Sequence, residues 1–188
     1  SNTEILFALG AGGQIAGRDT FSNFPPEALN LTDIGGPSFG SNLEMITSLQ
    51  PDLVLAAEIN TPEQVLEFEK LGLTVFYLNN PTAISGLYTN LEIVGVLTGR
   101  NDEASALIES LKARENAVNE KIASAKTQPR VFYEVDGTDP AKPWTTGPGS
   151  FMDTMIKQAG GINVGAGLHL QWGQISQEEL IIQNPEVI

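Results

Sequence analysis

Five aromatic side chains occupy segments that the sequence predicts to be loops, and together they suit the binding of a large, partly apolar molecule. Phe21 and Phe24 lie in FSNFPPEA, Phe39 in a Gly-rich stretch, and Trp144 and Trp172 in two later stretches that read as irregular. Any one ring could simply pack under its own loop. Five rings on connecting loops are better explained as walls of a binding cleft, because aromatic side chains bury large areas at ligand sites.

Two carboxylates and the single histidine could contact polar groups or a metal. Glu58 follows an apolar run that reads as a buried strand, and Glu134 lies inside another predicted strand. Ligand sites of α/β proteins form at the carboxyl ends of strands, so both could contact a ligand's amides or a metal, although a solvated role is commoner. His169 stands in a predicted loop; such a histidine is usually solvated, but it could be an axial ligand to haem or iron.

Enzyme chemistry is poorly supported by the composition. With one histidine and no cysteine, no catalytic triad suggests itself, and thiolate metal sites and disulfides are excluded. The Gly10-x-Gly12-Gly13 pattern resembles a dinucleotide-binding loop, but it follows a predicted helix, whereas that fingerprint must follow a strand.

Charge and hydropathy restrict the partners. Ten basic and 23 acidic residues give a formal net charge of −13, which argues against binding to nucleic acid and to anionic membrane surfaces. No apolar run approaches the length of a transmembrane helix. No resident cofactor is expected.

The elements that must position these residues alternate between helices and short apolar strands, which predicts an α/β fold. Residues 52–57 read as a strand buried on both faces, and residues 130–135 as another. Between them, residues 101–125 contain no Gly or Pro and place apolar residues at steps of three or four, which predicts one continuous helix. At ~37 Å it is long enough to join two lobes. From periodicity alone, a surface helix of a single domain fits equally well.

The sequence repeats on the two sides of this helix, which favours the reading of two lobes. A capping box, a helix and a Gly-Gly pair at residues 1–13 are matched at residues 150–161, and residues 42–54 align without gaps with residues 176–188. Two matches in the same order predict duplicated lobes with a ligand cleft between them. The predicted parts are an N-terminal lobe (1–80), helices (81–127) and a C-terminal lobe (128–188).

Glu44 and Glu178 occupy equivalent places in the two repeats. A carboxylate in the first turn of a helix interacts favourably with the helix dipole, and Glu44 also completes a predicted capping box with Ser41. A pair related by the duplication would in addition present one carboxylate from each lobe to a common partner.

Several longer motifs give the chain a family resemblance. They are SNTEILFALGAG, FSNFPPEA, N-L-E-M-I-x-x-L-x-P-D-L-V-L, G-x-G-S-F, A-G-G-x-N and W-x-Q-I-S-x-E-x-L-I-x-x-N-P. With these motifs the chain resembles, over essentially its whole length, the helical-backbone class of periplasmic binding proteins. These are the substrate-binding components of ABC importers. The resemblance is strongest to vitamin B12-binding members, whose relatives carry haem, siderophores or iron.

The resemblance implies a fold of two Rossmann-like lobes joined by one long helix, with the ligand held flat between the lobes by rings in matching loops. Phe21 or Phe24, and Trp172, match those rings best; the family's tryptophan aligns with Ser38 or Phe39, where this loop has an extra residue. It also implies that one glutamate in each lobe docks onto arginines of the membrane permease. The expected ligand-binding residues are Phe21, Phe24, Ser38, Phe39, Glu58, Trp144 and Trp172, and the expected docking residues are Glu44 and Glu178.

Family members have a strand just before the helix that begins at Ser1 and continue beyond Ile188. The chain is therefore expected to be a piece of a longer protein, lacking the first strand of lobe one and the final strands of lobe two. Its expected place is the periplasm or the extracellular face, with lipid anchoring through an absent N-terminal segment as one option.

The expected function is delivery of a corrinoid to an ABC permease without catalysis. Haem or a ferric siderophore ranks second. The aromatic loops suit a flat macrocycle, and the acidic charge suits a neutral or cationic ligand better than a multiply anionic one; the sequence does not separate these candidates. Two alternatives from other classes stay open. One is an α/β enzyme or metal-dependent lyase that uses Glu58, Glu134 and His169, and the other is a binding lobe that senses its ligand without transport.

Overall fold

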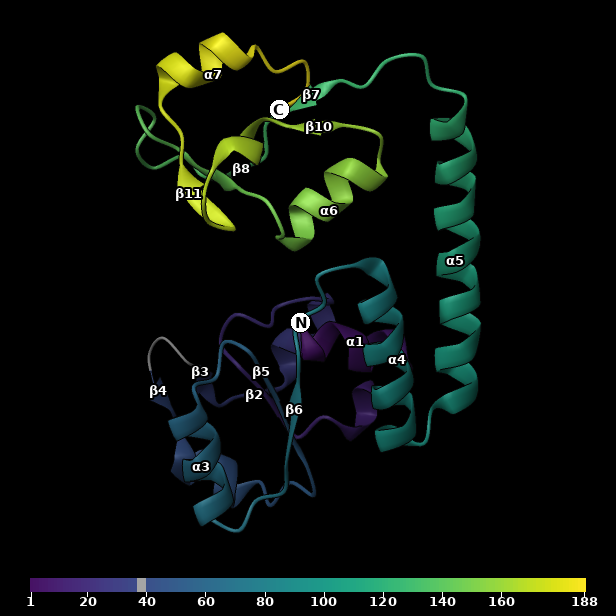
Figure 1. The fold of residues 1–188 in the computed structure, drawn as a ribbon. Helices are drawn as coiled ribbons and strands as arrows, with labels where there is room; N and C mark the ends of the chain where they lie inside the picture. The colour runs from purple at the N-terminus through teal and green to yellow at the C-terminus, as the bar shows by residue number, and fades with distance from the viewer. Residues whose placement is uncertain (37–39) are drawn as a thin grey trace. The chain divides into compact units, whose positions relative to one another are not determined.

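The computed structural model describes residues 1–36 and 40–188, which pack into two compact units (Figure 1). Unit 1 consists of residues 1–80 and 86–109, and unit 2 of residues 81–85 and 110–188. The second boundary falls inside one continuous helix, α5 (Asn101–Ala123). The predicted long helix is therefore confirmed; it begins at the predicted residue and ends two residues early.

Unit 1 contains three pairs of short strands with helices around them. Its elements in chain order are α1 (Asn2–Ala8), η1 (Gly12–Gln14), β1 (Gly17–Arg18), η2 (Pro26–Asn30), β2 (Thr32–Asp33), β3 (Gly35–Gly36), β4 (Gly40–Ser41), α2 (Leu43–Ser48), β5 (Val54–Ala57), α3 (Pro62–Lys70), β6 (Val75–Leu78), most of α4 (Ile84–Thr98) and the first turns of α5. β1 pairs with β2 and β5 with β6 in parallel, whereas β3 and β4 are antiparallel.

Helix starts follow the capping signals in the sequence, with one exception. Ser1 caps α1 in a complete capping box, as the sequence predicts. Thr61 caps α3 in a second complete capping box. The predicted box of Ser41 with Glu44 is wrong. Ser41 belongs to strand β4, so Asn42 takes the N-cap, and its side chain accepts a hydrogen bond from the Met45 N–H at 2.9 Å.

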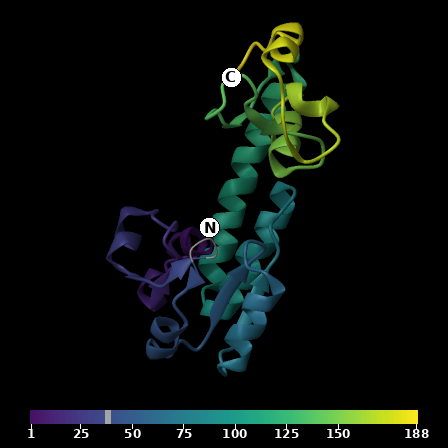
Figure 2. The same cartoon turned by 90° about the vertical axis from the view of Figure 1, so that its left-hand side faces the viewer.

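The helices α4 and α5 lie side by side in unit 1 (Figures 1 and 2). Val94 of α4 and Ala104 and Ile108 of α5 are buried in the core. A Cβ added at Gly95 would lie 2.7 Å from the Ala104 Cβ, so glycine at this position allows the two helices to approach closely.

Unit 2 is built around a three-stranded antiparallel sheet and a separate parallel pair. Its elements after α5 are β7 (Arg130–Val131), β8 (Glu134–Asp136), β9 (Trp144–Thr146), α6 (Phe151–Gln158), β10 (Ile162–Asn163), η3 (Val164–Gly167), β11 (Trp172–Gln174) and α7 (Gln177–Gln183). The sheet order is β11-β9-β8, and β7 pairs with β10 in parallel. Phe132, Val164 and Ile175 form the core, with Leu180 packed against them.

The predicted strand 130–135 divides between these two sheets. Residues 130 and 131 join β10, residues 134–136 join β9, and Phe132 between them turns its ring into the core. An uninterrupted run of strand-forming residues cannot reveal such a division, because only the partners of each half decide where it breaks.

The repeat predicted from the sequence is visible in the backbone around α2 and α7. Counting the N-cap as the first position, the ninth residue has a left-handed backbone and the tenth is proline. These residues are Asn42, Gln50 (φ +46°) and Pro51 at α2, and Ser176, Asn184 (φ +45°) and Pro185 at α7. The gap-free alignment of residues 42–54 with residues 176–188 therefore corresponds to one shared local structure.

The other match in the repeat is shifted from the prediction. The left-handed glycine that ends α6 is Gly160 (φ +79°), and its counterpart after α1 is Gly10 (φ +69°). Gly12 instead begins the short helix η1. The structural alignment therefore pairs Gly10, not Gly12, with Gly160, because the left-handed position just past the helix defines the equivalence.

A cavity of about 940 Å³ in unit 1 separates β1 from β5. Within the described ranges, β1 pairs only with β2 and β5 only with β6. In unit 2, β7 occupies the corresponding place, because Val131 pairs with both Asn163 and Val187. The cavity beside β5 explains why, within this strand, only Ala56 is fully buried, although burial on both faces is predicted.

Candidate functional site

Trp144 and Trp172 lie on neighbouring antiparallel strands of unit 2 rather than in loops. Trp172 of β11 pairs with Thr146 of β9, and Gln174 pairs with Trp144. Because side chains alternate along a strand, this register places both tryptophans on one face of the sheet as diagonal neighbours, about 7–8 Å apart. Each is 43% exposed. The prediction of irregular structure at both residues is wrong; the tryptophans form one surface, termed the tryptophan sheet (Trp144 and Trp172).

Close backbone contacts hold the two strands of the tryptophan sheet together. The Gly147 N–H donates to the Gln171 carbonyl at 2.8 Å, and a Cβ at Gly147 would lie 2.0 Å from the Leu170 carbonyl oxygen. Only glycine allows this approach. The Thr145 hydroxyl donates to the Tyr133 carbonyl at 2.8 Å, which ties β9 to the chain next to the core.

A network of buried polar side chains is hydrogen-bonded to β9. Thr146, Ser150, Asp153 and Asn163 are all buried. The Asn163 amide donates one hydrogen to the Thr146 carbonyl at 3.1 Å and the other to Asp153 Oδ1 at 2.9 Å. Asp153 Oδ2 accepts from the Gly149 N–H at 3.1 Å and from Lys157 Nζ at 2.7 Å. This network fixes the strand that carries Trp144.

Asp153 is ionised in this setting. Burial by itself raises the pKa of the Asp153 carboxyl, but hydrogen bonds from Lys157, Asn163 and the Gly149 N–H outweigh that effect, so its pKa lies below the usual value. A lowered pKa means that the carboxylate stabilises the fold fully above the unfolded-state pKa of about 3.9, and that this contribution is lost as the pH falls through the folded-state value.

We therefore predict that the stability difference between the wild type and Asp153→Asn is largest near pH 7 and shrinks below about pH 4. The amide keeps the size of the side chain but cannot carry the charge that Lys157 and Gly149 recognise. Urea unfolding at several pH values, followed by circular dichroism, measures the difference. A difference that is the same at pH 3 and pH 7 would contradict an ionised Asp153.

Phe21 and Phe24 lie in a well-anchored loop of unit 1, between β1 and η2, termed the phenylalanine loop (residues 19–25). Their side chains are 56% and 62% exposed. Arg18 is nine-tenths buried beneath the loop; it donates to the carbonyls of Ala28 at 3.0 Å and Asp19 at 2.8 Å. The prediction that two exposed rings occupy irregular structure holds here.

Asp19 and Asp33 complete the anchoring of the phenylalanine loop. Asp19 accepts hydrogen bonds from the Phe21 N–H at 2.9 Å and from the Ser22 hydroxyl. Asp33 accepts from the Thr20 hydroxyl at 2.9 Å. The Gly35 N–H, then Thr20 and Arg18, hold the pKa of Asp33 below its usual value. Sequence reasoning missed Arg18, although it is the only Lys or Arg among residues 1–69 of an acidic chain, which is a usable signal.

The remaining polar candidates are exposed or bonded to the backbone. Glu58 follows β5 and accepts a hydrogen bond from the Asn80 N–H, which follows β6, at 3.1 Å. It therefore bridges the carboxyl ends of the parallel pair. Glu134 lies exposed in β8, and His169 is exposed in the segment before β11. Across residues 1–36 and 40–188, no three His, Asp or Glu side chains are grouped closely enough to hold a metal ion.

Glu44 and Glu178 occupy the same position of their helices, the second residue after the N-cap, and both are exposed. The equivalence predicted from the repeat is therefore present in the structure. Ser38 and Phe39, also expected at the ligand site, lie outside the described residues.

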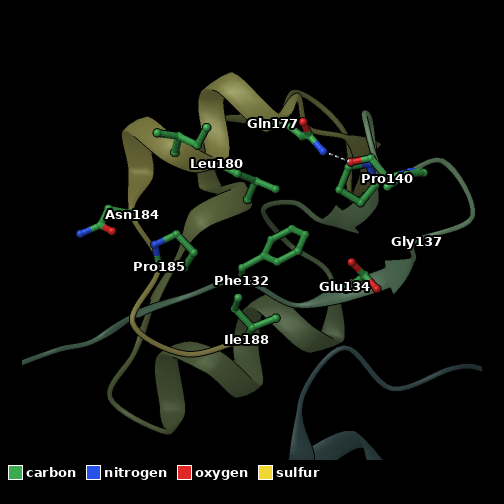
Figure 3. A pocket seen from close by; sticks show the side chains of 11 residues that line it. Phe132, Glu134, Gly137, Pro140, Gln177, Leu180, Asn184, Pro185 and Ile188 are labelled. Carbon is green, nitrogen blue, oxygen red and sulfur yellow. Dashed lines mark hydrogen bonds between the residues drawn. The ribbon is translucent and has the colours of Figure 1, made fainter.

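Unit 2 also contains a hollow of about 480 Å³. Figure 3 shows Phe132 pointing into it beneath Leu180 of α7, and Gln177 donating to the Pro140 carbonyl at 2.9 Å. Neither tryptophan lines it. We therefore locate the candidate site at the exposed rings of each unit and not at this hollow.

In the part of the chain that the structure describes, no helix is both long and apolar enough to cross a membrane.

Comparisons with known proteins place the chain among binding proteins. The sequence profile of a family described as "Periplasmic binding protein" matches residues 1–188. The chain is 32% identical over 193 residues to "Uncharacterized ABC transporter substrate-binding lipoprotein YvrC" of Bacillus subtilis (strain 168). It is 30% identical over 193 residues to a "Cobalamin-binding protein" of Halobacterium salinarum. Both alignments span the whole chain but only 60% and 51% of the relatives' lengths.

A solved structure shares the fold. The "Periplasmic heme-binding protein RhuT from Roseiflexus sp. RS-1 in apo form" is 28% identical and superposes with a TM-score of 0.84. The match covers 97% of this chain and 70% of that chain. The architecture of α/β units joined by one long helix is thus shared with a structurally characterised binding protein.

Proposed function

The chain belongs to the periplasmic binding protein family, and on that premise we propose that it is the extracytoplasmic substrate-binding component of an ABC importer. Its ligand is cobalamin or a related corrinoid, bound between an N-terminal lobe (1–80) and a C-terminal lobe (128–188) that the helices of residues 81–127 connect. The names of the B. subtilis and H. salinarum relatives support the importer role and the ligand, respectively.

The observation that carries the proposal is the set of four exposed rings on firm supports, two in each unit. Phe21 and Phe24 project from a loop anchored by Arg18, and Trp144 and Trp172 share one face of a sheet. Exposed aromatic rings held by a rigid framework lower the cost of ordering a binding surface. A flat macrocycle with apolar faces uses such rings better than a small polar solute does.

Transport requires a second contact, for which the two equivalent glutamates are suited. Glu44 and Glu178 pair with basic side chains of the permease. The protein then delivers its ligand without chemical change. The lipoprotein name of the B. subtilis relative supports anchoring to the outer face of a membrane. The net charge of −13 favours a neutral or cationic ligand.

Haem is the second candidate ligand, and two observations favour it. The solved structure that matches at 28% identity is named a heme-binding protein. His169 is exposed three residues before Trp172, and a histidine is a common axial ligand to haem iron.

Titration with cyanocobalamin, haem and a ferric siderophore separates these candidates. We expect cyanocobalamin to bind at micromolar concentration or tighter and to quench tryptophan fluorescence. His169→Ala should leave that affinity unchanged and weaken haem binding only. The absence of cobalamin binding at micromolar concentrations would exclude the first ligand, and tight haem binding that requires His169 would establish the second. Turnover of any of these compounds would contradict the absence of catalysis.

A further inference from the structure

Two isoleucines of α7 are unusually exposed and lie on the same side of the helix as Glu178. Ile181 is 77% and Ile182 75% exposed. They follow Glu178 by three and four residues, and residues at those spacings share one helix face. The carboxylate and the apolar pair therefore form one surface, termed the α7 face (Glu178, Ile181 and Ile182).

The internal repeat shows that these positions face outward in a lobe of this kind. Because α2 and α7 align from N-cap to proline, Thr47 corresponds to Ile181 and Ser48 to Ile182. In unit 1 the chain continues after α2 through β5, α3 and β6, and yet Thr47 and Ser48 remain exposed. The elements that follow α2 in unit 1 thus leave these two positions uncovered, and by the repeat we take Ile181 and Ile182 as surface positions of unit 2.

The corresponding surface of unit 1 has a different chemistry. The Thr47 hydroxyl donates to the Leu43 carbonyl at 2.7 Å, and the Ser48 hydroxyl donates to the Met45 carbonyl at 2.8 Å. Around Glu44, α2 therefore presents small polar side chains whose hydroxyls are bonded to the helix itself. Around Glu178, α7 presents two branched apolar side chains.

The charge of α7 limits what can cover its face. The helix sequence QEELIIQ contains two glutamates and no lysine or arginine, and the whole chain carries −13. A second copy of this chain would bring carboxylates against carboxylates, and an anionic lipid surface would be repelled. A protein surface with a cation beside an apolar patch is complementary to the carboxylate and to the isoleucines.

We infer that the two units dock unequally onto the permease: the α7 face supplies an apolar anchor next to its glutamate, whereas Glu44 makes a polar contact only. The inference rests on the proposed function, because the permease is the partner in question. The matching permease surface carries a basic residue flanked by apolar side chains where it meets α7, and a basic residue in polar surroundings where it meets α2.

Ile182 is the better residue for a test, because Ile181 also borders the hollow beneath Leu180 whereas Ile182 is not among its lining residues. Replacing Ile182 by serine gives α7 the residue that α2 carries at the same position. Burial of an isoleucine against a partner stabilises a complex by about 1.5 kcal/mol or more, so Ile182→Ser should weaken permease binding about tenfold. Ser48→Ala in unit 1 is the matched control and should change binding less than twofold.

The experiment measures binding of the protein to the permease–ATPase complex of an ABC importer from the same organism in lipid nanodiscs, with empty nanodiscs of the same lipid in parallel. Glu44→Gln and Glu178→Gln should weaken binding and reduce its salt dependence, whereas Ile182→Ser should weaken binding equally at low and high salt. Cyanocobalamin titration of each variant should match the wild type, which shows that the fold and the ligand site are intact.

Three results would overturn the inference. If Ile182→Ser binds the permease as the wild type does while Glu178→Gln binds weakly, docking occurs but without an apolar anchor. If Ile182→Ser reduces binding to empty nanodiscs as much as to the complex, the isoleucines contact lipid. If the wild type binds cobalamin but not the permease, the importer role itself fails, and the inference fails with it.

Discussion

Replacing both Trp144 and Trp172 by alanine is expected to weaken binding of the ligand at least about thirtyfold. Each tryptophan is 43% exposed in the free protein, and stacking on a flat ligand would cover much of that surface. A central aromatic anchor contributes about 2 kcal/mol when it is truncated, and each 1.4 kcal/mol is a factor of ten in affinity. The free-energy changes caused by substituting two neighbouring residues are usually not additive. The double variant is therefore expected to lose less affinity than the product of the two single losses. Calorimetric titration with cyanocobalamin measures it.

Tyr133→Ala is the matched control for this experiment. The Tyr133 ring is 41% exposed in the same unit, but it lies outside the tryptophan sheet, and its backbone carbonyl still accepts the Thr145 hydroxyl after substitution. The affinity of the Tyr133→Ala variant for cyanocobalamin should stay within about twofold of that of the wild type. If Tyr133→Ala weakens binding as much as the double variant, or if the double variant binds normally, the tryptophan sheet is not the ligand surface.

Helix ends are the part of the fold that the sequence predicts best, because their determinants are local. Ser1 and Thr61 begin their helices with side chains that bond within four residues, and Gly10 and Gly72 end theirs with left-handed backbone. The long helix α5 follows from its composition and periodicity alone. Where a local signal had a competitor, as with Ser41 beside Asn42, the nearby strand pairing decided the outcome.

The strands of unit 2 could not be predicted at the same level, because their partners are distant in sequence. Thr146 and Trp172 form a pair across 26 positions, and neither segment carries an alternating pattern long enough to be recognised. Gly147 and Gly173 in these segments read as loop residues. At Gly147, the absence of a Cβ is instead what lets two strands approach.

The candidate site was predictable in residue type but not in arrangement. The exposed rings and the equivalent glutamates follow from motifs and from the repeat. Their supports do not: Arg18 anchors the phenylalanine loop through backbone carbonyls, and Asp153, which reads as the third residue of a capping box, turns inward to Asn163. Buried polar networks depend on groups from several elements, so no single stretch of sequence reveals them.

Replacing Asp153 by alanine is expected to lower the free energy of unfolding of unit 2 by about 3 kcal/mol. The substitution leaves one hydrogen of the buried Asn163 amide without its acceptor, and a buried donor without a partner costs about 1–3 kcal/mol. The shorter side chain also leaves a small void under β9. Urea unfolding followed by tryptophan fluorescence is well suited to the measurement, because the two tryptophans of the chain are Trp144 and Trp172, both in unit 2.

The variant Lys157→Ala separates the contribution of the buried hydrogen bonds to stability from that of the Asp153–Lys157 ion pair. Lys157 bonds the same carboxylate at 2.7 Å, but its side chain is 59% exposed, and an ion pair with a largely solvated partner contributes about 1 kcal/mol or less. The lysine variant should therefore unfold close to the wild type, while Asp153→Ala unfolds at much lower urea. Because the network fixes β9, Asp153→Ala should also weaken ligand binding at temperatures where unit 2 is still folded. Equal destabilisation by the two variants would assign the effect to the ion pair and would remove the buried network as the support of the tryptophan sheet.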